Sequence, residues 1–108
     1  MAGEKEAKAK KPGAVGFFAQ NVPEQFAFHV CDGAVLRNLK DTVKELRKMN
    51  DGTFSYHVNK QKNDFANWIA DVMGYKDLAY NIIGKNKLHT AAEIVSYVSK
   101  KSGKKVVV

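Results

Sequence analysis

The residues most able to carry chemistry are three histidines and a single cysteine. A structural zinc site needs about four ligands, drawn from cysteine and histidine at short spacings. His29 and Cys31 form the only close pair, and the sequence contains neither C-x-x-C nor H-x-x-x-H. We therefore expect no metal and no cofactor. Cys31 is then best explained as a small buried hydrophobic residue.

An enzymatic interpretation rests on Cys31, His57 and Asp64, because a cysteine nucleophile needs a base and a group that orients that base. Nothing near Cys31 in the sequence marks an activated thiol. The polar and aromatic run from His57 to Ile69 could line a site, although capping and packing explain most of it. The roles of His57, Asp64 and Trp68 beyond packing stay open. We expect no catalytic residue unless the first three groups converge on one pocket.

Length and composition favour one small domain. The chain has 108 residues, of which 44% are hydrophobic, enough for a single core. No apolar run approaches the roughly 20 residues that span a bilayer, and the charged N-terminal segment lacks the apolar stretch of a secretory signal. A lone cysteine suits a reducing compartment. We therefore expect a cytoplasmic protein without a membrane partner.

Positive charge is concentrated at the two ends of the chain. Residues 1–13 hold four lysines and two glutamates, and residues 100–108 hold four lysines and no acid. Residues 14–99 are nearly neutral, with 10 basic and 9 acidic residues. We predict basic tails at 1–13 and 100–108 around one globular domain at 14–99. Such tails suit contact with the phosphates of a polyanion.

A basic loop before the last predicted helix adds to this charge. No zinc-finger spacing or RRM motif is present, so we expect contacts with phosphates rather than with bases. The eight glycines also form no nucleotide-binding loop. The candidate nucleic-acid-binding residues are Lys5, Lys8, Lys10, Lys11, Lys85, Lys87, Lys100, Lys101, Lys104 and Lys105.

A short hairpin is predicted near the N-terminus. Apolar residues alternate over 26–30, Asp32-Gly33 follows, and Ala34–Leu36 is apolar again. Asp-Gly favours a two-residue type I′ turn. The predicted cross-strand pairs are Cys31 with Ala34 and Val30 with Val35. Before the hairpin, Phe17 and Phe18 lie in an apolar segment that we expect to dock on the core.

The rest of the chain has helical patterns with polar residues at their starts. Apolar residues recur at spacings of three and four, and glycines follow three of the patterns. These patterns predict a mostly α (α+β) fold, a small helical bundle with an N-terminal β-hairpin. The predicted N-terminal caps are Asn38, Thr53, Asn63 and Thr90, the last in a capping box with Glu93.

Several motifs together resemble a known domain family. They are Asp32-Gly33 followed by V-L-R-N-L at 35–39, H-V-N at 57–59, and N-D-F-A-N-W-I at 63–69. Over about residues 26–84 the chain resembles an uncharacterised, largely archaeal domain family of unknown function. The resemblance implies a domain but transfers no site residue. Some relatives are appended to larger sugar-handling chains, whereas lysine tails here favour a free-standing protein.

The main functional hypothesis is a non-enzymatic RNA-associated protein, bound to the ribosome or another ribonucleoprotein through its lysine-rich tails. One alternative is a protein-interaction or regulatory module that binds a protein partner through Phe17 and Phe18 or the hairpin edge. A DNA-coating protein is a second alternative, because lysine tails contact the phosphates of either polymer.

Overall fold

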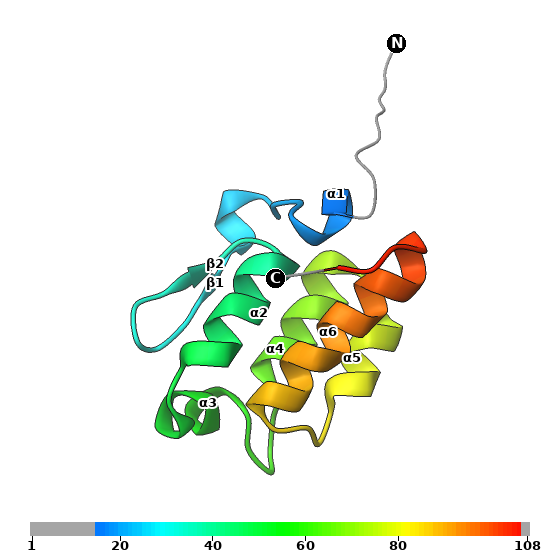
Figure 1. Ribbon diagram of the computed structural model, residues 1–108. Coiled ribbons are helices and arrows are strands. Elements are labelled where there is room, and N and C mark those ends of the chain that lie inside the picture. Colours follow the sequence, from blue (N-terminus) through cyan, green and yellow to red (C-terminus); the bar gives the residue numbers. More distant parts are fainter. Residues whose placement is uncertain (1–14, 107–108) are drawn as a thin grey trace.

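Two long helices, α2 (Leu39–Lys48) and α6 (Lys87–Ser102), pack side by side in the computed structural model, which describes residues 15–106 (Figure 1). Helices α4 (Asp64–Trp68) and α5 (Lys76–Ile82) lie behind them, and the hairpin lies beside α2 (Figure 1). The predicted mostly helical fold with one small antiparallel hairpin is confirmed. The remaining elements are α1 (Val15–Phe18), the 3-10 helix η1 (Glu24–Phe26), β1 (Phe28–His29), β2 (Val35–Leu36), α3 (Asp51–His57) and the π-helical turn η2 (Ile69–Met73).

Asparagine side chains cap four of the helices. Asn38 and Asn63 accept hydrogen bonds from the N–H groups of Asp41 and Ala66, as predicted. The predicted caps Thr53 and Thr90 are wrong, because α3 and α6 begin two or more residues earlier. Asn50 and Asn86 cap these helices instead, and the two threonines are buried inside them.

The hairpin register differs by one residue from the prediction. Phe28 pairs with Leu36 and His29 with Val35, so a three-residue loop replaces the two-residue turn. Gly33 in this loop has a φ of 101°, which favours glycine. Cys31 does not pair with Ala34, because the Ala34 carbonyl oxygen accepts the Val30 N–H, and the Cys31 N–H instead donates to His57. The cysteine is also exposed rather than buried.

One apolar core joins the helices to the N-terminal segments. It includes Phe65, Ile69 and Ile94, all of which are fully buried. The Trp68 indole N–H donates a hydrogen bond to the carbonyl oxygen of Phe26 across 2.7 Å and ties η1 to α4. As predicted, the segment before the hairpin docks on this core, through the buried Phe18. None of the helices within residues 15–106 is long and apolar enough to cross a membrane.

The folded domain extends past residue 99, where the sequence predicts its end. Helix α6 continues through Ser102, and Gly103 closes it with a φ of 73°. Val106 then packs into the core with 7% of its surface exposed. Its N–H also donates to the hydroxyl oxygen of Ser99. The last turn of α6 and the buried Val106 therefore belong to the folded domain, while the lysines between residues 100 and 105 are exposed.

Candidate nucleic-acid interface

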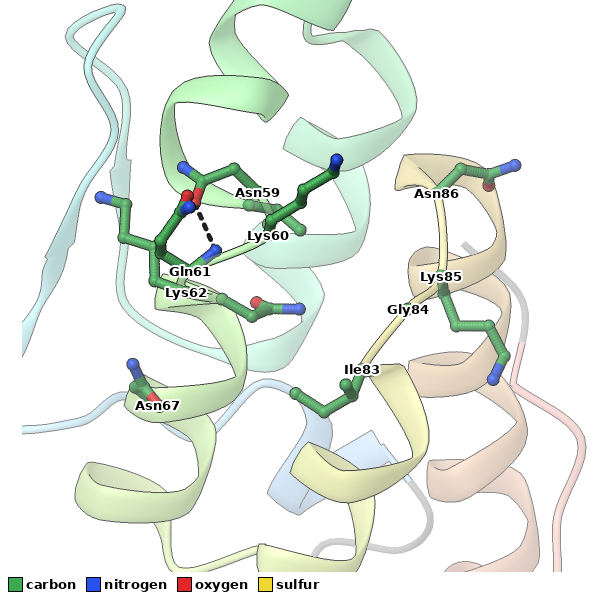
Figure 2. Close-up of a pocket in the computed structure, with 11 residues that line it drawn as sticks. Asn59, Lys60, Gln61, Lys62, Asn67, Ile83, Gly84, Lys85 and Asn86 are labelled. Atoms are coloured by element: carbon green, nitrogen blue, oxygen red, sulfur yellow. Dashed lines mark hydrogen bonds between the residues drawn. The ribbon is translucent and has the colours of Figure 1, made fainter.

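A groove of about 750 Å³ lies between two loops at one end of the bundle (Figure 2). One loop, residues 58–63, joins α3 to α4, and the other, residues 83–86, joins α5 to α6. Both loops lie at the end of the bundle opposite α1 (Figure 1). The groove is lined by Val58, Asn59, Lys60, Gln61, Lys62, Asn63, Asn67, Ile83, Gly84, Lys85 and Asn86.

The lining is basic and rich in amides. It contains three lysines, five amide side chains and no carboxylate. Asn59 uses its side-chain oxygen to accept the N–H of Gln61, which shapes the first loop (Figure 2). Within residues 15–106 the side-chain amides of Gln61 and Asn67 make no hydrogen bond and remain able to bind a ligand. Amides of this kind donate and accept hydrogen bonds, and lysines bind anions.

The three lysines of the groove differ in their surroundings. Lys60 extends across the gap towards the side of Asn86 and has no ion pair within the described residues (Figure 2). Lys62 turns away, because its ammonium lies 2.9 Å from Asp64 and 5.2 Å from the centre of the Tyr56 ring. Lys85 is half-buried and also lacks an ion pair in this part of the chain. Lys60 and Lys85 are therefore the lysines available to an anion.

The start of α6 strengthens the positive potential of the groove. A helix N-terminus carries partial positive charge, so cations there are unfavourable for the helix. The first turn of α6 nevertheless has no acid, and Lys85, Lys87 and His89 lie around it. Lys87 is neutralised, because its ammonium lies 2.7 Å from Asp51 and donates to the carbonyl oxygen of Met49. Lys87 therefore has a structural role, whereas Lys85 keeps an uncompensated charge.

The C-terminal lysines lie at the other end of α6. Lys100, Lys101, Lys104 and Lys105 are all exposed. Lys101 lies 3.7 Å from Asp77 and 5.4 Å from the centre of the Tyr97 ring. Cations in the last turn of a helix are favoured by its dipole, so the helix alone accounts for Lys100 and Lys101.

Tyr97 and Asp77 anchor this end of α6 to α5. The Tyr97 hydroxyl donates a hydrogen bond to Asp77 across 2.9 Å. Burial and this bond to a carboxylate raise the pKa of Tyr97 to about 12. The same hydrogen bond lowers the pKa of Asp77. Tyr97 is therefore a neutral hydrogen-bond donor at physiological pH. Its ring contacts Lys101, Phe17 and Tyr75 and is not free to stack on a base.

The remaining predicted binding residues fall outside this site. Lys5, Lys8, Lys10 and Lys11 lie outside the described residues. Phe18 is only 1% exposed, and Phe17 packs edge-on against the rings of Tyr75 and Tyr97. The prediction that Phe18 binds a protein partner is therefore wrong, because its side chain is buried in the core. The ring of Phe17 is not free either, because it packs against the two tyrosines.

The buried His57 and the partly exposed Asp64 form a pair outside the groove. The Nδ1 atom of His57 lies 3.0 Å from an Asp64 carboxylate oxygen, and its Nε2 atom accepts the Cys31 backbone N–H across 3.0 Å. An imidazole that accepts at Nε2 must carry its proton on Nδ1, which then donates to Asp64. His57 Nε2 is therefore hydrogen bonded to the backbone amide of Cys31 and not to its thiol. Cys31, His57 and Asp64 are not among the residues that line the groove, so they do not converge there.

The described residues contain no group of three or more His, Cys, Asp or Glu side chains that could hold a metal ion. His29 is exposed on β1, and His57 is committed to the two hydrogen bonds given above. His89 lies in the first turn of α6 and is exposed. The three histidines therefore lie in separate elements, and only His57 is buried.

The pKa of Asp64 makes stability depend on pH. Burial raises the pKa of this carboxyl, but hydrogen bonds from Lys62 and His57 outweigh burial and hold it below its ordinary value of 3.8. The stabilisation is therefore complete above the unfolded-state pKa and is lost as the pH falls through the folded-state pKa. In urea unfolding, the wild type should have a higher free energy of unfolding than Asp64→Asn at neutral pH. We expect this difference to disappear as the pH falls from about 5 to about 2. A difference that stayed constant over this range would contradict the assignment.

The sequence pattern indicates only one of the two available lysines in the groove. Lys85 is among the predicted binding residues, but Lys60 is not. The polar run from His57 to Ile69 does supply several lining residues, including Asn59 and Asn67. The available signal was the loop sequence K-Q-K-N at 60–63, two lysines and two amides without an acid.

Comparisons of the chain with protein-family models, with curated proteins and with solved structures give no match. The resemblance to an archaeal domain family stays a prediction.

Proposed function

We propose that this protein is a non-enzymatic RNA-associated protein that binds phosphates in the groove and along its lysine-rich ends. The observation that carries the proposal is the groove lining, with three lysines, five amide side chains and no carboxylate. Polyanions bind to such surfaces by releasing counterions, without a catalytic group or a cofactor. A ribosome or another ribonucleoprotein particle is the partner that we propose.

The placement of the lysines favours a polymer over a small anion. Lys60 and Lys85 lie near the start of α6, Lys100 and Lys101 lie in its last turn, and Lys104 and Lys105 follow its end. The helix has 16 residues, so these two groups are separated by roughly 24 Å at about 1.5 Å per residue. Phosphates of one extended chain, or of one structured RNA surface, can meet both groups.

The position of Lys85 adds a second argument. Its charge lies at the positive end of α6, where it disfavours the helix, and no acid within the described residues pairs with it. A ligand phosphate would supply the missing negative charge. Lys87, two residues later, already has Asp51 as its partner and needs none.

The double variant Lys60→Ser with Lys85→Ser tests this proposal. We expect RNA affinity near 0.1 M salt to fall about tenfold or more, and the slope of log K against log salt to lose about 1.4, because each phosphate contact contributes about 0.7. The measurement is fluorescence anisotropy of a labelled RNA oligonucleotide over a salt series.

The matched control is Lys44→Ser with Lys76→Ser. These two lysines are exposed, lie outside the groove and have no ion pair within residues 15–106, so the control has the same net charge. We expect it to bind RNA nearly as well as the wild type. Equal losses in both double variants would show an effect of net charge only, and wild-type binding that shows no salt dependence would overturn the proposal.

A further inference from the structure

The groove continues beyond Ile83 and Lys85 onto a second hollow of about 310 Å³. Ile83 and Lys85 line both hollows, which makes the surface continuous. Tyr80, Asn81 and Glu93 complete the second one. The combined surface therefore runs from the 58–63 loop to the exposed side of α5.

Tyr80 is the unusual residue of this surface. Its side chain lies on α5 with 81% of its area exposed, and the ring has no ring contact or hydrogen bond within residues 15–106. Ile83, one turn later, is 54% exposed and directs its side chain into the groove (Figure 2). An aromatic ring and an aliphatic side chain side by side provide an apolar surface next to the lysines and amides.

This arrangement has the three parts that bind an unpaired nucleic-acid strand. Lysines meet the backbone, an exposed aromatic ring stacks on a base, and side-chain amides meet base edges. In a duplex the bases are already stacked and paired, so Tyr80 and the amides of Gln61 and Asn67 would have nothing to bind. Resting on the proposed association with RNA, we infer that the groove binds a single-stranded segment with one base stacked on Tyr80.

The single carboxylate of this surface determines where the phosphates and the base of the bound strand lie. Glu93 lies at the Tyr80 end, whereas the lining at the 58–63 loop has no acid. Phosphates are repelled by Glu93 and attracted by Lys60 and by Lys85, which lines both hollows, so they follow the two lysines and leave the Tyr80 ring to a base. The base therefore points towards Tyr80, with Ile83 beneath the sugar or the base.

Substitution of Tyr80 separates stacking from charge. We expect Tyr80→Ala to weaken binding of a labelled uridine decamer about tenfold, because loss of one stacked base has an effect of this size. The slope of log K against log salt should not change, because no charge is removed. Tyr80→Phe keeps the ring and should restore wild-type affinity. Phe26→Ala is the control, because this aromatic residue is 51% exposed and lines neither hollow.

A blunt-ended, fully paired RNA duplex completes the experiment. We expect it to bind more weakly than the uridine decamer and to be insensitive to Tyr80→Ala. If Tyr80→Ala bound the decamer as well as the wild type while Lys60→Ser with Lys85→Ser weakened it, stacking would be excluded and the RNA proposal would stand. If wild type bound neither RNA, the proposed function itself would fail. Tighter binding of a thymidine decamer than of the uridine decamer would overturn the assignment to RNA.

Discussion

Replacing His57 with alanine is expected to lower the free energy of unfolding by about 3 to 4 kcal/mol. The ring is 5% exposed and packs against Phe28 and Phe65. Its removal leaves a cavity in the core and takes the acceptor away from the Cys31 N–H and the donor away from Asp64. Loss of packing and loss of two hydrogen bonds therefore act together.

Urea unfolding followed by circular dichroism measures this effect. His29→Ala is the control, because His29 is an exposed residue on β1, and we expect a change within about 0.5 kcal/mol. His57→Phe keeps most of the ring volume and removes both hydrogen bonds, so it should lose about half as much as His57→Ala. A loss below about 1 kcal/mol for His57→Ala would show that the hairpin does not depend on this residue.

The local parts of this fold could be predicted from the sequence. The α2 stripe formed by Leu39, Val43 and Leu46 is buried as its spacing indicates. Asn38 and Asn63 cap their helices because the capping geometry involves only residues three positions apart. Thr90 was misleading for the same local reason, since Asn86 is an equally good cap and begins the helix one turn earlier.

The nonlocal parts could not be predicted from the sequence. The hairpin loop includes a hydrogen bond between the Cys31 N–H and His57, which lie 26 residues apart. The groove depends on packing that brings the 58–63 loop beside the 83–86 loop. In the sequence each loop is a short polar connection, and such connections are common on any protein surface. Lys60 and Lys85 line the same groove only because the fold brings these two loops together.

Replacing Lys100, Lys101, Lys104 and Lys105 together with serine is expected to have the largest effect on RNA binding. The slope of log K against log salt should lose up to about 3, and affinity near 0.1 M salt should fall about a hundredfold or more, if each lysine meets one phosphate. The free energy of unfolding should fall by only about 1 kcal/mol, because all four side chains are exposed and the helix dipole and the surface ion pair of Lys101 with Asp77 each contribute little. Anisotropy with a labelled RNA over a salt series measures the slope.

The control for this variant removes the same charge elsewhere. Its four changes are Lys40→Ser, Lys44→Ser, Lys48→Ser and Lys76→Ser, on α2 and at the start of α5. In sucrose gradients of lysate at low salt, we expect wild type and control to sediment with ribosomal or other RNA-rich particles, and to lose this position after RNase treatment.

The variant without the C-terminal lysines should move to the light fractions in the same gradients. Since the helix dipole alone favours Lys100 and Lys101, their presence does not by itself require a ligand. The experiment therefore separates a dipole effect from a binding effect, because salt also screens the helix dipole but only binding to an RNA particle responds to RNase. Wild-type protein that stayed in the light fractions at low salt would contradict association with a ribonucleoprotein particle. The ligand of the groove would then be smaller than such a particle.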